Sequence, residues 1–149
     1  MELKRNHSVP KEEAPQGQSV AGLSLTILAG VASKPATDSN AQSVVLLVRY
    51  GEFEALLTGD APVAVEEAIL DDLPSDLEVV KVGHHGSNTS TSPELAVISV
   101  GARNRYSHPH TAVVNRIIES GARILRTDLS GEIVIRARRS GLHDVRTEW

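Results

Sequence analysis

The sequence of 149 residues contains no cysteine, few aromatic residues and no long apolar run. Without cysteine, the chain can form neither a disulfide framework nor a thiolate metal site, so any metal must be held by histidine and carboxylate groups. Aromatic side chains make up only 3% of the residues, and a core must therefore be built from aliphatic side chains. No segment approaches the roughly 18 apolar residues of a membrane span, and the first residues lack the apolar centre of a signal peptide. We therefore expect a soluble polypeptide.

The length and composition are those of a single globular domain. A chain of 149 residues is long enough for one hydrophobic core, and 40% hydrophobic with 23% charged residues is ordinary. The formal net charge of −4 provides no general attraction to nucleic acid. The C-terminal part is more basic, and a solvated face is the favoured interpretation of its arginines: Arg103, Arg105, Arg116, Arg123, Arg126, Arg136, Arg138 and Arg139.

The pattern of apolar residues predicts a mixed α/β domain. Alternating or β-rich runs predict strands over residues 22–28, 43–50, 53–58, 77–82, 95–100, 123–125 and 132–135. Only Gly51 and Glu52 separate the second strand from the third, which predicts a β-hairpin. Helices are predicted over residues 62–71, where proline suits the first turn, and 111–120, where Gly121 follows an apolar stripe. The hairpin and the later alternation of strands and helices indicate one mixed sheet.

Polar groups that suit metal or phosphate binding follow three of these strands. Asp60 follows the third strand, His84 and His85 stand between glycines after the fourth, and residues 104–110 follow the fifth. Side chains at strand ends are where α/β proteins assemble their sites. Neutral imidazole is the commonest metal ligand, and a solvated surface has little need for two adjacent histidines between glycines. These clusters favour a metal-dependent hydrolase site, or a substantial part of one.

Several of these residues also have structural interpretations. Asp60 is equally suited to cap the helix that begins near residue 62. Ser87 and its polar neighbours could donate hydrogen bonds to phosphate oxygens or form an ordinary polar loop. For His110, a capping or surface role at the start of the second helix is favoured over ligation. His108 precedes Pro109, which favours an extended backbone suited to reaching into a cleft.

The chain resembles the metallo-β-lactamase-fold domain of the ComEC competence proteins in four ordered segments: SVVLLVRYGEFEALLTGD, LEVVKVGHHGSNTSTS, LAVISVGARNRYSHPH and GARILRTDLSGEIVI. The resemblance covers residues 20–137, with residues 1–19 as a polar lead-in and 138–149 as a C-terminal tail. It implies an α+β fold, the C-terminal half of an αββα sandwich, with a mixed sheet and helices on one face.

The same resemblance implies roles for individual residues. Asp60 corresponds to the bridging metal ligand, and His84 and His85 to the late histidine ligand and its neighbour. Asn104, Tyr106 and His108 correspond to the motif on the substrate side and would be the catalytic residues. From their residue types, we also expect Ser87, Arg105 and His110 to contact the substrate. The complete domain holds two divalent metal ions, zinc or manganese. The family's first metal motif, His-x-His-x-Asp-His, is absent from this sequence, so the site in this chain is incomplete. Ser107 stands where the family usually has glycine.

The implied function is a nuclease that degrades the DNA strand not imported during natural transformation. Its partners would be single-stranded DNA and the rest of the ComEC membrane protein, at the extracytoplasmic face of the bacterial inner membrane. We expect the isolated chain to be weakly active or inactive. Because half a sandwich exposes one sheet face, we also expect the chain to pair with a second copy, or to cover that face with its own lead-in. Two alternatives stay open: a non-catalytic binding module that retains half the fold, and a metal hydrolase of another substrate, such as a phosphocholine ester or a lactone.

Overall fold

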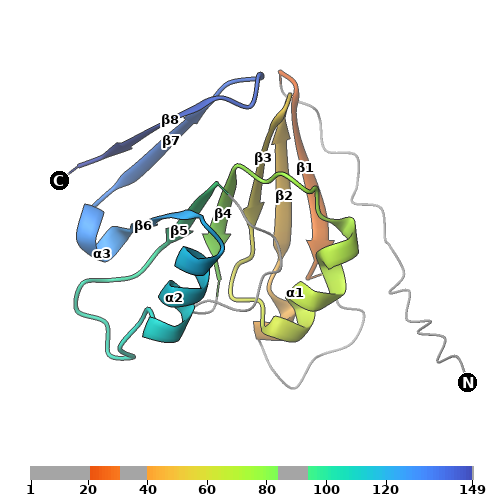
Figure 1. Ribbon diagram of the computed structural model, residues 1–149. Coiled ribbons are helices and arrows are strands. Elements are labelled where there is room, and N and C mark those ends of the chain that lie inside the picture. Colours follow the sequence, from red (N-terminus) through yellow and green to blue (C-terminus); the bar gives the residue numbers. More distant parts are fainter. Residues whose placement is uncertain (1–20, 31–39, 84–93, 149) are drawn as a thin grey trace, which may run out of the picture.

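The computed structural model describes residues 21–30, 40–83 and 94–148, and it confirms the predicted α+β class with a mixed sheet (Figure 1). Six neighbouring strands form the main sheet, in the order β1 (Leu23–Ala29), β2 (Val45–Tyr50), β3 (Phe53–Leu57), β4 (Val79–Val82), β5 (Leu95–Ile98) and β6 (Arg123–Arg126). Strands β7 (Ile133–Ala137) and β8 (His143–Thr147) form a separate two-stranded sheet.

The direction of the strands changes once across the main sheet. β1, β2 and β3 are antiparallel neighbours, and the pair Tyr50 and Phe53 closes the predicted hairpin. β3, β4, β5 and β6 are parallel to one another. The carboxyl ends of four strands therefore lie at one edge of the sheet, which is where binding sites form in α/β folds.

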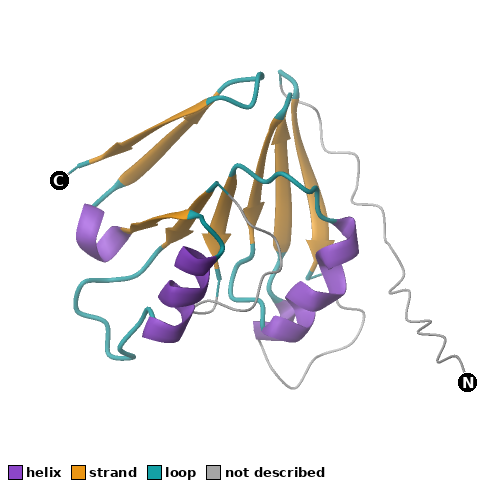
Figure 2. Ribbon diagram, viewed as in Figure 1, coloured by secondary structure: helices purple, strands orange, loops and turns teal. Residues whose placement is uncertain are grey.

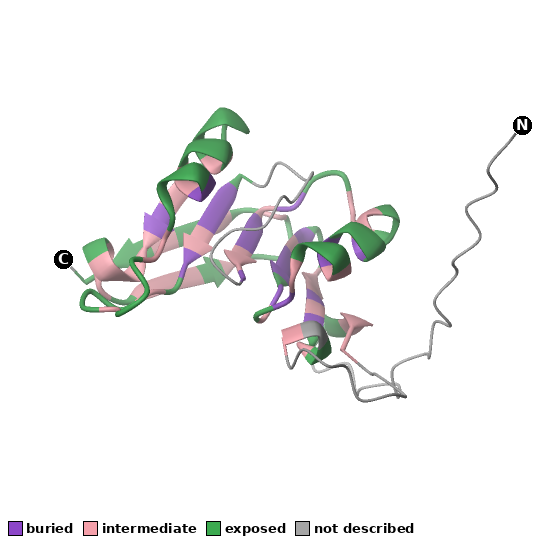
Figure 3. Cartoon of the chain, turned by 90° about the horizontal axis from the view of Figure 1, so that it is seen from below, coloured by how far each residue is buried: buried purple, intermediate pink, exposed green. Residues whose placement is uncertain are grey.

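The helices are short. They are α1 (Val63–Ile69), α2 (Thr111–Glu119) and α3 (Thr127–Ser130), with 3-10 turns at Asn40–Gln42 and Leu70–Asp72. α1 contacts β1 while α2 contacts β6, at opposite ends of the main sheet (Figure 2). α1 and α2 cover the same face of the main sheet, as expected (Figure 3). α3 is a single helical turn between β6 and β7. Among the described residues, no helix has the length and apolar character needed to cross a membrane.

Two apolar clusters form the core, one on each face of the sheet. On the helix-covered face, side chains of β2, β3 and β4 pack with α1, and the buried members are Val45, Leu47, Leu56, Ala61, Ile69, Leu77 and Val80. On the other face, the buried members are Phe53, Ala55, Val79, Leu95 and Leu125, with side chains of β7 and β8 packed against them. Neighbouring residues of one strand point to opposite faces, which explains why Leu56 and Ala55 belong to different clusters.

The C-terminal hairpin supplies a second layer that the sequence pattern did not predict. Residues expected to form a tail make the turn and β8, and the tip of the hairpin is anchored to the main sheet. There the Glu52 N–H donates to the carbonyl oxygen of Arg139 over 2.8 Å. The guanidinium of Arg139 lies 5.4 Å from the centre of the Tyr50 ring and donates to the carbonyl oxygen of Ala21.

The hairpin covers only part of its face. Burial alternates along the apolar run at residues 44–48, because Val45 and Leu47 are buried while Val44 is 47% exposed. By strand register, Leu23, Leu25 and Leu57 lie on the face that carries the hairpin, and they are 37%, 57% and 37% exposed. These three leucines are called the uncovered leucine patch below.

Candidate active site at the strand ends

The turn after β3 presents Asp60 at the edge of the sheet. Thr58 is fully buried and its hydroxyl donates to the carbonyl oxygen of Lys81 on β4 over 3.0 Å. The Asp60 N–H donates to the Ser43 hydroxyl over 3.2 Å, and Gly59 has a φ of +58°, which a residue with a side chain rarely adopts. The Asp60 side chain is exposed, so its carboxylate faces outward from the tightly held turn.

The capping interpretation of Asp60 is wrong. The residue at the N-cap position of α1 is Pro62, and no side chain caps that helix end. Asp60 lies two residues earlier, in the turn, where its backbone rather than its carboxylate is fixed. Its exposed carboxylate is therefore available for a ligand.

The end of β4 packs directly against this turn. A Cβ atom added at Gly83 would lie 2.3 Å from the Thr58 hydroxyl and 2.5 Å from the carbonyl oxygen of Gly59. Real side chains do not tolerate such distances, so only glycine fits where the two strand ends meet. Gly83 is followed in sequence by His84 and His85. Those two residues and Ser87, all predicted site residues, lie outside the described residues.

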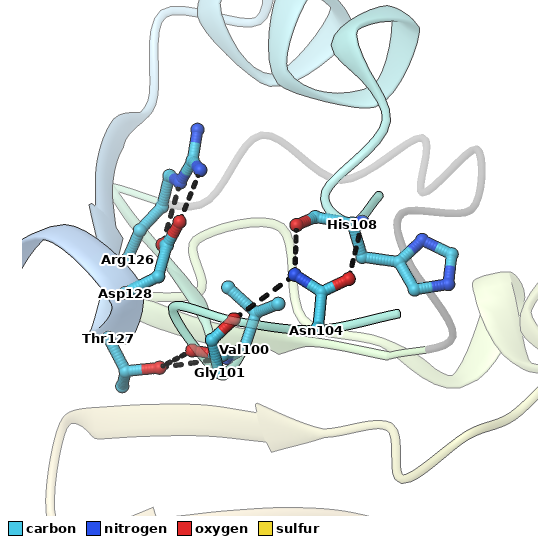
Figure 4. A network of polar contacts seen from close by, with 7 residues as sticks. All are labelled: Val100, Gly101, Asn104, His108, Arg126, Thr127 and Asp128. Atoms are coloured by element: carbon cyan, nitrogen blue, oxygen red, sulfur yellow. Dashed lines mark hydrogen bonds and ion pairs between the residues drawn. The ribbon is translucent and has the colours of Figure 1, made fainter. Parts of the chain in front are cut away.

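The loop of residues 99–110 follows β5, and the side chain of Asn104 organises it (Figure 4). Its Nδ2 donates to the carbonyl oxygens of Gly101 and His108 over 3.1 and 2.9 Å. Its Oδ1 accepts from the N–H groups of Tyr106 and His108 over 3.2 and 2.8 Å. Ser107 has a φ of +57°, which explains why glycine is the usual residue there in the family that the chain resembles.

Three rings from this loop lie in contact. The rings of Tyr106 and His108 are stacked with centroids 5.7 Å apart, and the ring of His110 meets that of His108 edge-on at 4.7 Å. Tyr106 is 74% exposed and His110 is exposed, while His108 is half-buried between them. His110 occupies the N-cap position of α2, but its side chain makes no capping hydrogen bond. Arg105 is also exposed on this loop.

The predicted site residues thus fall into two groups at one edge. β4 separates β3 from β5, and two inter-strand spacings correspond to about 10 Å. Asp60 and His108 therefore follow strands of the same edge that are not direct neighbours. A substrate spanning several ångströms, such as a phosphodiester with its sugar, could contact both groups.

Three polar residues that the sequence analysis did not single out also lie near the site or in the core. Thr127 and Asp128 follow β6 directly, just as Asp60 follows β3. This position after a strand was the feature of the sequence that could have marked them as candidate site residues. Arg126 binds the Asp128 carboxylate through Nε and Nη2 at 3.0 and 2.5 Å. The hydrogen bond from Arg126 holds the pKa of Asp128 below its ordinary value, although burial acts in the opposite direction.

Glu66 is the third residue, and it is buried in α1. Its side chain is only 3% exposed, and its Oε2 has no hydrogen-bond partner in the part of the chain that the structure describes. Burial raises the pKa of Glu66 from 4.5 to about 7. It lies three residues before the buried Ile69, on the inward stripe of the helix, and this spacing was the feature of the sequence that could have indicated its burial.

The described residues do not form a metal site by themselves. Within residues 21–30, 40–83 and 94–148, no group of three or more histidine, cysteine, aspartate or glutamate side chains could hold a metal ion. The predicted ligands, the carboxylate of Asp60 and the imidazoles of His84 and His85, have the donor chemistry that suits zinc or manganese. Metal binding stays a prediction.

The chain is similar in sequence to three competence or recombination proteins. It is 35% identical over 147 residues to ComE operon protein 3 of Bacillus subtilis, and the aligned region covers 91% of this chain and 19% of the relative. It is 42% identical over 115 residues to competence protein ComA of Neisseria gonorrhoeae, covering 70% of this chain and 17% of the relative. It is 38% identical over 102 residues to recombination protein 2 of Haemophilus influenzae, covering 63% of this chain and 13% of the relative.

These relatives point to the competence proteins of the ComEC type, in agreement with the sequence motifs. The chain spans less than a fifth of the length of each of them. No family model matches the chain, and no solved structure matches it significantly. The metallo-β-lactamase fold therefore stays a prediction from the motifs.

Proposed function

We propose that this chain is part of a metal-dependent phosphodiesterase domain in a ComEC-type competence protein, and that the domain degrades the DNA strand not imported in natural transformation. The observation that carries the proposal is the close packing of the Asp60 turn against the end of β4, at Gly83. The histidine-bearing loop after β5 lies at the same sheet edge. The similarity to competence protein ComA supports the link to DNA uptake.

In this proposal, Asp60 would be one of the residues that hold the divalent metal ions. His84 and His85 would supply imidazole ligands, a prediction that rests on their place in the sequence directly after Gly83. When bound, the metals would supply Lewis-acid stabilisation and an activated water for attack on phosphorus. The remaining ligands would come from outside this sequence. Asp60 is suited to ligation because its N–H is held by Ser43 and its turn is held to β4 by Thr58, while its carboxylate is exposed.

The loop after β5 would form the substrate side. His108, half-buried between two rings, would steady the phosphate or protonate the leaving oxygen. The exposed side chains of Tyr106, Arg105 and His110 would contact the DNA backbone or bases, as would Ser87. The phosphate charge makes the guanidinium of Arg105 the strongest of these contacts, since arginine can bind phosphate with two hydrogen bonds.

A non-catalytic binding module is the second candidate. It is favoured by one observation, namely that no three-ligand group occurs among the described residues. In that case the same exposed loop would bind DNA or a protein segment without cleaving it. The two candidates differ in what Asp60 does. In a nuclease it would be a metal ligand that cleavage requires, whereas in a binding module its carboxylate would only repel the DNA phosphates.

A segment exchange tests the proposal. The matching segment of the Neisseria gonorrhoeae relative is replaced by residues of this chain, and the transformation frequency and the cleavage of incoming DNA are measured. We expect the exchanged protein to function, and Asp60→Asn and His108→Gln to abolish cleavage. Arg136→Gln, an exposed change on β7, is the matched control and should be silent.

Protein levels by immunoblot show whether each variant accumulates. If the Asp60→Asn protein accumulates normally and still degrades the second strand, Asp60 is not a metal ligand of a nuclease. Unchanged cleavage by His108→Gln would remove the proposed role of the loop.

A further inference from the structure

The start of the loop of residues 99–110 is held by a threonine on the neighbouring strand. Backbone pairing between β5 and β6 ends at Ile98 and Arg126. Two residues further along, the Val100 N–H donates to the Thr127 hydroxyl over 2.8 Å, and that hydroxyl donates to the Val100 carbonyl oxygen, also over 2.8 Å. One side chain thus takes the place of a pair of ladder hydrogen bonds where the loop leaves the sheet.

Asn104 makes the second fixed point of the loop. Its four hydrogen bonds go to backbone groups of Gly101, Tyr106 and His108. A side-chain amide offers two donors and two acceptor sites, so these contacts use its full capacity. The amide has no group left for a substrate in this arrangement. Any influence of Asn104 on a reaction must therefore act through the residues that it holds, and His108 is held at both its N–H and its carbonyl group.

We infer that Thr127 and Asn104 are positioning residues that together set the place of His108 at the sheet edge. Their contacts form one continuous path from β6 through Thr127 to Val100, and from the adjacent Gly101 through Asn104 to His108 (Figure 4). The inference rests on the proposed role of His108 beside the substrate. Such placement matters because an error of about 1 Å in a reacting group can cost about 10²-fold in rate.

Amide hydrogen exchange in the 149-residue chain tests the inference without requiring activity. Thr127→Val removes both hydrogen bonds and keeps the shape, while Thr127→Ser keeps the hydroxyl. In Thr127→Val we expect exchange at Val100 to rise about fivefold, as follows from a hydrogen bond worth about 1 kcal/mol. Exchange at His108, which Thr127 does not touch directly, should rise as well. Thr127→Ser should show the wild-type rates.

Ile124→Val, on the same strand, is the control for a general loss of stability. It should raise exchange across the sheet without a selective effect at His108. If exchange at His108 in Thr127→Val is no faster than in Ile124→Val, the positioning role of Thr127 is wrong. Asn104→Ala gives an independent check, because it removes the direct bond to the His108 N–H and should raise exchange there above the level of Thr127→Val.

The exchanged Neisseria protein provides a functional readout. There, Thr127→Val should lower DNA cleavage and Thr127→Ser should restore it, which a purely structural loss would not do. The two proposals can fail separately. Full cleavage by His108→Gln would contradict the proposed function, whereas a His108 exchange rate insensitive to Thr127 would contradict the positioning role alone.

Discussion

The hydroxyl of Thr58 donates a 3.0 Å hydrogen bond to the carbonyl oxygen of Lys81, and this contact joins the ends of β3 and β4. Thr58 is fully buried, so the hydrogen bond is shielded from water and costly to leave unmade. It aligns the turn that carries Asp60 with the strand that leads to the two histidines. The close fit at Gly83 depends on this alignment.

Gly83→Ala should therefore destabilise the chain. Its Cβ would overlap the Thr58 hydroxyl and the backbone carbonyl of Gly59, and a backbone atom cannot rotate aside. Overpacking of this kind typically costs about 1–3 kcal/mol of unfolding free energy. Urea denaturation measures the change. Gly101→Ala is the matched control, because a Cβ there would meet nothing within 4 Å. Equal stability of the two variants would show that the strand ends are not packed as described.

Glu66 should make stability depend on pH. Its pKa of about 7 in the folded chain lies above the ordinary 4.5, so the folded state binds the proton more tightly. The protonated Glu66 therefore contributes to the stability of the folded chain. This contribution is fully present below about pH 4.5 and is lost as the pH rises through about 7. Over that window the unfolding free energy should fall by about 3 kcal/mol, at about 1.4 kcal/mol per pH unit.

Glu66→Gln should remove this dependence and be more stable than the wild type at pH 8. Urea denaturation at pH 5 and pH 8 measures both effects. The neighbouring Glu67 is exposed on the same helix, and Glu67→Gln should leave the pH dependence as it is. A Glu66→Gln protein with the wild-type pH profile would mean that this carboxyl group does not titrate in the folded chain.

The uncovered leucine patch should drive association. We expect the chain to form a dimer at micromolar concentration, because Leu25 is 57% exposed on the sheet face that also carries the exposed Leu23 and Leu57. Light scattering measures the molecular mass. Leu25→Lys should shift the equilibrium to monomer, whereas Ile118→Lys, at a 60% exposed position on α2, should not. A monomeric wild type that binds no hydrophobic dye would contradict this prediction.

The main sheet was predictable because local patterns determine its elements. The glycine turn after Tyr50 and the alternating apolar residues specify the first hairpin, and strand ends rich in polar groups mark the edge that carries Asp60. The class of fold, the hairpin and the helix-covered face were confirmed.

The second layer was not predictable in the same way. β8 has the sequence HDVRT, with a single aliphatic residue, so its pairing produces no alternating pattern. It is placed by contacts distant in sequence, such as the ring of His143 lying 5.8 Å from that of Phe53. The role of Thr127 likewise depends on the register of β5 and β6, which no local motif encodes. The capping role of Asp60 could be excluded only once the N-cap of α1 was located at Pro62.

Metal titration of the isolated chain tests the central claim most directly. The missing first metal motif predicts weak binding, with no zinc or manganese retained after dialysis and little or no DNA cleavage. At high Mn²⁺ concentration, paramagnetic broadening of NMR signals should begin at Asp60 and extend to His108, and Asp60→Asn should abolish it. If broadening instead begins at the exposed pair Asp71 and Asp72 and leaves Asp60 unaffected, the strand-end edge is not a metal site and the proposed hydrolase function is contradicted.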